Sequence, residues 1–418
     1  MAQIKDTLTD RNPWWKGKFV AEYKDREIYD KVKKFIPLPQ IISFTGLRRV
    51  GKTTLMYKIV EDAIKDGMDP GNIVYFPFDE FSKTEVRRVL NAYEELVEKD
   101  LREGKFLILL DEIQKLENWE NQLKAFYDTF KANAKIIISG SESLFIRKKS
   151  KETLAGRMFE FKVESLSFRE YLGFRGMKYE PVGIYEKELR RSFDDYIFTM
   201  GFPELVGIRD KDIIRKYVKE GIVDKVIYQD LPKIFEIEDV SKLESLLNIF
   251  MEDPGQIVEI DELGKELGLV RQTLSNYIGY LEKSFLLQKV YNYSKNRRKV
   301  ERKLKKYYPA LISVDLLFRD DAHSRSKVFE WLIVRQLNAE FFWRNPQKDE
   351  VDVILENGTP AEIKYGKIEV GGVVKFMNQF GVARGFILSY EKEGEQTVDG
   401  KKISIVPAYK FLLGKKIG

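Results

Sequence analysis

The sequence predicts an α/β fold built around a parallel β-sheet. Three runs of mostly apolar and often β-branched residues support this prediction, because strands buried on both faces of a parallel sheet have this composition: Ile41–Thr45, Lys105–Leu110 and Lys135–Gly140. A glycine-containing loop and an amphipathic helix starting near Thr53 follow the first run, and paired acids follow the second. Ligands of open α/β sheets bind at the carboxyl ends of such strands.

Composition limits the kinds of protein and of site that the chain can form. Its 418 residues correspond to about three domains. We find no apolar run approaching the roughly 18 residues of a membrane span, and no hydrophobic signal region follows Met1, so we expect a cytoplasmic protein with no membrane partner. The absence of cysteine and the single histidine leave carboxylates and phosphates as metal ligands, which favours Mg²⁺ or Mn²⁺.

The overall charge says little about partners. The chain carries 33% charged residues and a formal net charge of +6. A Lys- and Glu-rich composition without cysteine is typical of thermophiles, whose surfaces carry many Lys and Arg side chains for other reasons. Binding to nucleic acid therefore has to be inferred from local clusters of basic residues.

The loop after the first strand has the pattern G-x-x-x-x-G-K-[ST], in the strand, loop and helix context of a P-loop. We therefore predict a binding site for ATP or ADP. Gly46 and Gly51 let the loop curl around phosphates, Lys52 reaches the β and γ phosphates, and Thr53 offers a hydroxyl to Mg²⁺. The predicted nucleotide-binding residues are Gly46, Leu47, Arg48, Arg49, Val50, Gly51, Lys52, Thr53 and Thr54.

The second strand ends in Asp111 and Glu112, as in a Walker B motif. We predict that Asp111 holds Mg²⁺ through water, and that Glu112 orients and deprotonates the attacking water. The same acids are compatible with an N-cap for the helix that contains Trp119 and Leu123.

The order of these motifs resembles the AAA+ class of P-loop ATPases. In that class a polar sensor follows the next strand and a Gly-Arg precedes the last core strand; Ser141 and Arg157 stand at these places. The resemblance implies that Ser141 reads the γ-phosphate and that Arg157 is an arginine finger acting in a neighbouring subunit of a homo-oligomer. Turn chemistry for Ser141 and a surface salt bridge for Arg157 remain open alternatives, and no sensor-2 arginine is evident.

Four further segments resemble the prokaryotic, largely archaeal, AAA-type P-loop ATPases that carry a winged helix and a C-terminal PD-(D/E)xK nuclease-like domain. They are Asp111–Lys115, Leu154–Arg157, Glu164–Tyr171 and Gly201–Glu204. The resemblance is strong over residues 40–205 and looser afterwards. The resulting organisation is an AAA+-type core over 1–167, a helical lid or connector over 168–250, a winged helix over 251–310 and a nuclease-like α/β domain over 311–418.

The predicted winged helix begins with two helices around Gly268, with apolar positions at three- and four-residue steps. Its second helix starts near Val270, where DNA-binding helices face bases and phosphates. A strand over Phe285–Tyr293 then leads into residues 295–306, of which eight of twelve are Lys or Arg. DNA binding is the favoured interpretation, and protein contacts by a solvated basic hairpin are the alternative.

A second group of acids lies in the last hundred residues. Asp352 is followed by Glu362 and Lys364 in an E-x-K pattern, and Glu330 lies on a predicted amphipathic helix. This resembles the PD-(D/E)xK nucleases, in which the strand acids, here Asp352 and Glu362, hold Mg²⁺ and the lysine positions or activates water. Val351 stands where that superfamily often has proline.

The turn between these strands decides whether both acids can reach one metal. A two-residue turn at 357–358 would place Asp352 and Glu362 on opposite faces of the sheet. A three-residue loop over 356–358, with Gly358 in the left-handed region, would pair residue 352 directly with 362 on one face. We predict the three-residue loop.

The predicted function is a Mg²⁺-dependent ATPase that binds DNA through its winged helix and cleaves or processes it with the C-terminal domain. The alternative is an ATP-driven switch or regulator that binds DNA or protein without cutting anything. A nuclease fold can persist as a binding platform.

Overall fold

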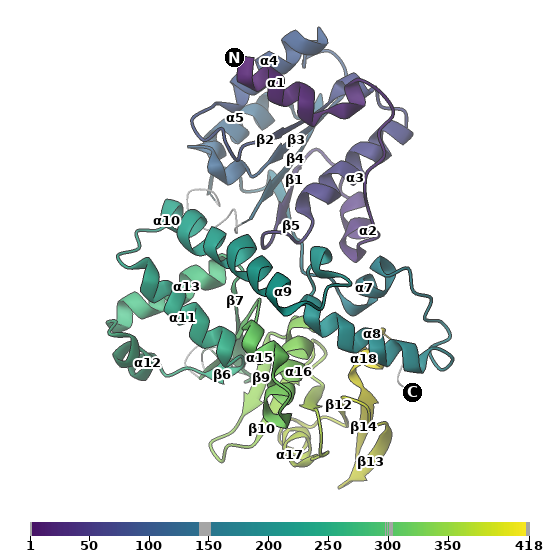
Figure 1. The fold of residues 1–418 in the computed structure, drawn as a ribbon, viewed down its shortest axis with the longest axis vertical. Coiled ribbons are helices and arrows are strands. Elements are labelled where there is room, and N and C mark those ends of the chain that lie inside the picture. The colour runs from purple at the N-terminus through teal and green to yellow at the C-terminus, as the bar shows by residue number, and fades with distance from the viewer. Residues whose placement is uncertain (1, 142–151, 297, 299, 301–303, 415–418) are drawn as a thin grey trace. The chain divides into compact units, whose positions relative to one another are not determined.

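The computed structural model describes residues 2–141, 152–296, 298, 300 and 304–414. The chain divides into two compact units, unit 1 over Met1–Ser165 and unit 2 over Leu166–Gly418, and each is treated by itself (Figure 1). The predicted end of the core at residue 167 lies close to this border. None of the helices in the described ranges is both long enough and apolar enough to cross a membrane.

Unit 1 contains a five-stranded sheet in the order β2-β3-β4-β1-β5, and every neighbouring pair is parallel. The strands are β1 Ile41–Thr45, β2 Ile73–Pro77, β3 Phe106–Asp111, β4 Ala134–Gly140 and β5 Met158–Lys162. The three strands predicted from apolar runs are β1, β3 and β4, which lie side by side. The parallel α/β prediction is confirmed for this unit, and the ends of β1, β3 and β4 meet at one edge of the sheet.

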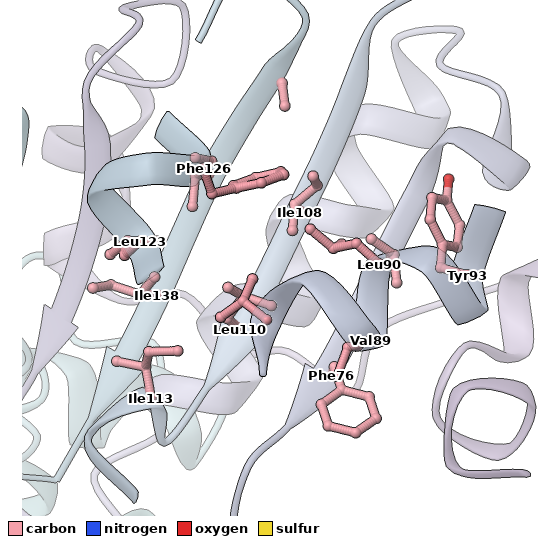
Figure 2. Close-up of a cluster of buried hydrophobic side chains, with 14 of the residues drawn as sticks. Phe76, Val89, Leu90, Tyr93, Ile108, Leu110, Ile113, Leu123, Phe126 and Ile138 are labelled. Carbon is pink, nitrogen blue, oxygen red and sulfur yellow. The ribbon is translucent and has the colours of Figure 1, made fainter. Parts of the chain in front are cut away.

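Helices cover both faces of this sheet (Figure 1). They are α1 Ala2–Arg11, α2 Glu27–Lys33, α3 Lys52–Lys65, α4 Val86–Val97 and α5 Trp119–Phe130, with short 3₁₀ turns at Pro13–Trp15, Pro70–Asn72 and Ile113–Lys115. A large cluster of buried apolar side chains lies between the sheet and α1, α4 and α5, and Figure 2 shows part of it. In α4, Val86, Val89, Leu90 and Tyr93 recur at three- and four-residue steps, which directs them all to this cluster.

Unit 2 begins with helices and continues with a mixed α/β arrangement. Its helices are α7 Phe168–Phe174, α8 Glu186–Thr199, α9 Lys211–Val218, α10 Leu231–Ile234, α11 Val240–Glu252, α12 Ile260–Leu267, α13 Arg271–Lys283, α15 Val314–Phe318, α16 Ala322–Gln336, α17 Gly371–Phe380 and α18 Ala408–Leu412. A 3₁₀ turn lies at Pro203–Leu205, and π-helical turns lie at Lys219–Val223 and Val226–Asp230. The segment predicted to be helical, from Phe168 to about Met251, holds α7 to α11.

A nine-stranded sheet in the order β13-β14-β12-β11-β10-β9-β7-β8-β6 forms the rest of unit 2. The strands are β6 Gln256–Ile257, β7 Leu287–Asn292, β8 Lys305–Pro309, β9 Phe341–Arg344, β10 Glu350–Ile354, β11 Pro360–Lys364, β12 Arg384–Ser389, β13 Gly394–Val398 and β14 Lys401–Pro407. Strand β7 pairs in parallel with β9. The predicted border between residues 310 and 311 therefore does not separate two sheets, because strands from both sides of it share one.

Candidate functional site

The P-loop follows β1 at the carboxyl edge of the unit 1 sheet. Gly46 and Gly51 both have positive φ angles, +142° and +98°, which side chains disfavour. A Cβ atom on Gly46 would lie 2.4 Å from the carbonyl oxygen of Val163, so the close approach of the loop to the chain after β5 also requires glycine here. Leu47 and Val50 are buried.

Lys52 and Thr53 open α3, directly after the loop. The ammonium of Lys52 donates to the carbonyl oxygens of Gly46 and Leu47, at 3.1 and 3.0 Å, and the residue is buried. Its position over the curled backbone, together with the helix N-terminus, concentrates positive charge where phosphates bind in a P-loop. Thr54 is half-buried one residue further along the helix.

Asp111 is the centre of a hydrogen-bond network at the end of β3. Its carboxylate accepts from the Thr53 hydroxyl and the Tyr75 hydroxyl, each at 2.7 Å, and from Ser139 at the end of β4. Burial and the adjacent Asp111 carboxylate raise the pKa of Tyr75, which keeps its phenol a proton donor. A hydroxyl and a carboxylate held side by side are oxygen donors of the kind that Mg²⁺ prefers, so the residues present fit this ion.

Glu112 and Ser141 are brought together by Gln114, which the sequence analysis did not select. The Gln114 amide donates to Glu112 Oε2 at 2.5 Å and to Ser141 Oγ at 3.1 Å. The only signal for it is its place two residues after the predicted base. The alternative N-cap role of the acids is wrong for α5, because that helix begins after Asn118.

A further carboxyl group that the sequence analysis missed, Asp79, lies near the two Walker B acids. Burial raises the pKa of Asp79, and the charges of Glu112 and Asp111 raise it further, while Arg48 opposes them. This edge of the sheet is therefore rich in negative charge, which a bound cation would offset.

Arg26 is another residue that the sequence did not reveal. It precedes α2, is buried, and donates from its guanidinium to the carbonyl oxygens of Val50 and Glu164, each at 2.7 Å. It thus ties the P-loop to the segment that follows β5. No motif surrounds position 26, so the pairing is visible only in the folded chain.

Arg157 lies away from the nucleotide-binding residues of its own chain. Its carbonyl accepts from the N–H of Ile41 at the start of β1, whereas the P-loop follows the end of that strand. Its guanidinium forms two hydrogen bonds to Asp128, at 3.0 and 3.2 Å, and lowers the pKa of that carboxyl. Within one chain the salt bridge is therefore the arrangement present.

The β10–β11 hairpin has the predicted three-residue loop. Val353 pairs with Ala361 and Ile354 with Pro360, and the N–H of Leu355 donates to Thr359 O. Gly358 has a φ of +80°. Continued by one residue, this register sets Asp352 opposite Glu362, and the Lys364 ammonium lies 2.7 Å from Glu362 Oε1.

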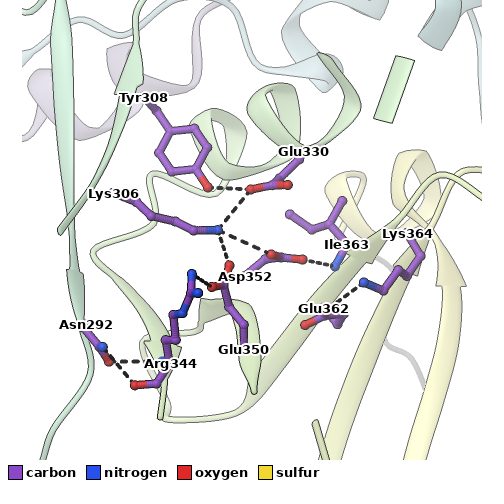
Figure 3. A network of polar contacts seen from close by, with 10 residues as sticks. All are labelled: Asn292, Lys306, Tyr308, Glu330, Arg344, Glu350, Asp352, Glu362, Ile363 and Lys364. Atoms are coloured by element: carbon purple, nitrogen blue, oxygen red, sulfur yellow. Dashed lines mark hydrogen bonds and ion pairs between the residues drawn. The ribbon is translucent and has the colours of Figure 1, made fainter. Parts of the chain in front are cut away.

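A lysine ammonium from β8 lies among the acids of unit 2 (Figure 3). Lys306 Nζ is 2.5 Å from Glu350 Oε1, 3.3 Å from Glu330 Oε1 and 3.8 Å from Asp352 Oδ1. Burial alone would lower the pKa of Lys306, but the surrounding carboxylates raise it well above its usual range. Burial raises the pKa of Asp352, and Glu362 and Glu330 add to this rise.

This arrangement does not fit the metal that the nuclease resemblance implies. Across the part of the chain that the structure describes, no three Asp, Glu or His side chains are grouped so that they could hold a metal ion. Instead, the Lys306 ammonium supplies the positive charge between Glu330 and Asp352. Lys306 was predicted to belong to a basic wing available to DNA, and this prediction is wrong for it, because its side chain is buried.

Comparisons with known proteins support the predicted AAA-type domain in unit 1, and they assign no function to unit 2. A family model described as an AAA domain matches residues 38–172, and a domain of unknown function, DUF8612, matches residues 190–310. Residues 38–172, which carry the P-loop and Walker B geometry above, are thus similar to an AAA domain.

Relatives and solved structures share much of the chain's length. Two uncharacterized proteins of Methanocaldococcus jannaschii, MJ1637 and MJ1544, are 27% and 25% identical; the alignments cover 95% and 88% of this chain and 92% and 87% of theirs. The Walker-type ATPase PABY2304 of Pyrococcus abyssi is 15% identical with a TM-score of 0.41, over 72% of this chain and 97% of that one. AMPPCP-bound DnaA from Aquifex aeolicus is 16% identical with a TM-score of 0.30, over 63% and 89%. These two scores are too low to bear on function.

Proposed function

We propose that this chain is a Mg²⁺-dependent ATPase whose catalytic residues lie in unit 1. The observation that carries the proposal is the 2.7 Å hydrogen bond between Thr53 and Asp111, which joins the P-loop helix to the Walker B strand. The fold brings these two motifs to one edge of the sheet. The Thr53 hydroxyl and the Asp111 carboxylate therefore meet there, and Glu112 is the next residue along the chain.

Each residue then has a defined role. The P-loop backbone and Lys52 bind the phosphates, and Thr53 and Asp111 would hold Mg²⁺, which supplies positive charge to the phosphoryl oxygens when bound. Glu112 orients the attacking water and accepts its proton. Gln114 holds Glu112 next to Ser141, which positions the base relative to the side chain predicted to read the γ-phosphate.

Removal of the metal tests the proposal directly. Phosphate should be released from ATP in the presence of Mg²⁺, and the release should fall to background in excess EDTA. The reason is that Thr53 and Asp111 carry no positive charge of their own to offset the phosphates. Restoring Mg²⁺ should restore turnover. Hydrolysis that persists in EDTA would contradict the assignment of Thr53 and Asp111.

We also propose that Arg157 acts in trans, in a homo-oligomer. Arg157→Ala is then expected to reduce turnover by about 10³-fold or more while ATP affinity is kept. Asp128→Ala is the matched control, since it breaks the same ion pair and leaves the guanidinium in place. If Arg157 serves only the surface pair, both variants should behave alike, with little effect on turnover. A shared site also predicts that specific activity rises with protein concentration as the oligomer forms. Specific activity that is independent of protein concentration over that range would contradict it.

For unit 2 we infer DNA binding by the α12–α13 helix pair. Gly268, with a φ of +61°, ends α12, and the first turns of α13 expose Arg271, Gln272, Ser275 and Asn276. These side chains match the kind that contact bases and phosphates at the start of a recognition helix. Arg271 pairs with Asp261 in an exposed contact of 2.6 Å, which DNA phosphates could replace.

The basic segment before β8 provides the test of DNA binding. Arg298 is exposed, while Arg297, Arg302 and Lys303 lie outside the described residues. Replacing these four residues by Gln is expected to weaken binding and to flatten its dependence on salt, by up to about 0.9 log units of slope per lost phosphate contact. The same replacement of four exposed lysines of unit 1, Lys16, Lys18, Lys33 and Lys34, is the control. An unchanged slope would remove the basic segment from DNA binding.

Metal-dependent DNA cleavage by Glu330, Asp352, Glu362 and Lys364 is less well supported than binding without cleavage. The specific observation is the Lys306 ammonium between two of these acids. It favours the alternative function, an ATP-driven switch whose second unit binds DNA or protein without cutting it. Incubation of plasmid, single-stranded and branched DNA with Mg²⁺, with and without ATP, separates the two functions.

A further inference from the structure

We propose that unit 2 contains a cation site filled by its own lysine: the Lys306 ammonium takes the place of a divalent metal, and the surrounding carboxylates bind Mn²⁺ or Mg²⁺ only when that ammonium is removed. This property belongs to the nucleotide-free protein and is independent of ATP hydrolysis.

The contacts of Lys306 are those of a bound cation. Its side chain is 7% exposed, and three carboxylates from two elements face its nitrogen: Glu330 from α16, and Glu350 and Asp352 from β10. Figure 3 shows the ammonium at the point where these side chains converge. An ammonium offers three donors and a single charge, so it satisfies carboxylate oxygens without a metal.

The charges around this point explain why lysine and metal exclude each other. Lys306 and Arg344 both pair with Glu350, the latter at 3.1 Å, and Lys364 pairs with Glu362. Unpaired charge in a buried place is unfavourable, and a divalent ion placed against a buried ammonium would repel it strongly. Metal binding at these acids therefore requires the ammonium to leave.

One carboxylate oxygen of the cluster points independently to a cation site. Glu362 is 8% exposed, and its Oε2 atom has no hydrogen-bond partner in the described part of the chain. Buried polar atoms are nearly always paired, so an orphaned carboxylate oxygen opposite Asp352 marks an incomplete coordination shell. With Lys306 absent, Glu330, Glu350, Asp352 and Glu362 provide oxygen ligands of the type that Mn²⁺ and Mg²⁺ bind.

A hydroxyl next to the ammonium holds the arrangement in place. Tyr308, two residues further along β8, donates from its hydroxyl to Glu330 Oε1 at 2.7 Å, the same oxygen that Lys306 contacts. Residues i and i+2 of a strand share one face, so β8 directs both side chains at the acids. The lysine is therefore part of a built site on this strand.

The test is Mn²⁺ binding to the nucleotide-free, full-length chain, measured by calorimetry and by the electron paramagnetic resonance signal of free Mn²⁺. Lys306→Ala and Lys306→Met are expected to gain about one bound Mn²⁺ per chain relative to the parent protein. Lys289→Met is the matched control, because Lys289 lies on the neighbouring strand β7, pairs with Glu282 of α13 and is outside the cluster. The double variant Lys306→Ala with Asp352→Asn should lose the gained ion, which assigns it to the cluster rather than to the P-loop.

Thermal unfolding gives a second measurement, which remains informative if the variants are less stable than the parent protein. Without divalent ions the Lys306 variants should melt at lower temperature than the parent, because buried carboxylates lose their counter-charge. Mn²⁺ should raise their melting temperature, or allow refolding where EDTA does not, and should leave the Lys289→Met protein unchanged. Two results would overturn the proposal: Mn²⁺ binding by the parent that Asp352→Asn abolishes, or Lys306 variants that neither bind Mn²⁺ nor gain stability from it.

Discussion

Glu112→Gln is expected to bind ATP with the affinity of the parent protein and to hydrolyse it at least about 100-fold more slowly. The amide keeps the size and hydrogen bonding of the side chain but cannot accept a proton from water, and general-base catalysis contributes about 10²–10⁴-fold. Because Gln114 holds Glu112 by an amide-to-carboxylate hydrogen bond, the substituted side chain can stay in place by turning its own oxygen toward Gln114. Calorimetry and phosphate release measure the two properties separately.

Lys52→Ala is the companion variant and is expected to fail earlier, at binding. The buried ammonium lies over the loop carbonyls of Gly46 and Leu47, where β and γ phosphates are bound. Its loss should weaken ATP binding beyond detection at concentrations that saturate the parent. Full hydrolysis by Glu112→Gln would remove Glu112 as the base, and tight ATP binding by Lys52→Ala would remove the P-loop assignment itself.

Arg26→Ala is expected to weaken ATP binding by about 10- to 100-fold, although Arg26 belongs to no motif. Its guanidinium holds the carbonyls of Val50 and Glu164, and each charge-assisted hydrogen bond contributes about 1.5–3 kcal/mol. Without it the P-loop is no longer tied to the segment after β5, so part of the binding energy is spent on ordering the loop.

Two controls separate this role from a general loss of charge. Arg26→Lys should restore little, because a lysine cannot reproduce two fixed hydrogen bonds of a guanidinium. Lys18→Ala, at an exposed position of the same segment, should have no effect. ATP affinity that is equal in Arg26→Ala and the parent would show that the P-loop holds its conformation without this contact.

Some of the architecture follows from the sequence because the determining interactions are local. Strands β1, β3 and β4 are apolar runs, and the P-loop needs its glycines within a few residues of the helix that they precede. The β10–β11 hairpin is equally local: three residues between the strands, with glycine in the left-handed conformation, set the register and hence the face shared by Asp352 and Glu362.

Contacts between residues far apart in the sequence were decided only by the tertiary structure. Arg26 meets Glu164 across 138 residues, Gln114 reaches Ser141, and Arg157 pairs with Asp128, none of which a motif or a period encodes. The same holds for the parallel pairing of β7 with β9, which joins two predicted domains into one sheet.

The environment of Lys306 could not be predicted from the sequence. In the sequence it is one of eight basic residues in a run of twelve and reads as part of a solvated, DNA-binding surface. In the folded chain β8 turns it inward, and acids that follow it by 24 to 46 residues surround its ammonium. The sequence alone determined that unit 1 carries a P-loop and Walker B acids, since local spacing defines both. Whether the C-terminal acids face a metal or a lysine depends on which strand lies beside them, and only the packing of distant segments decides that.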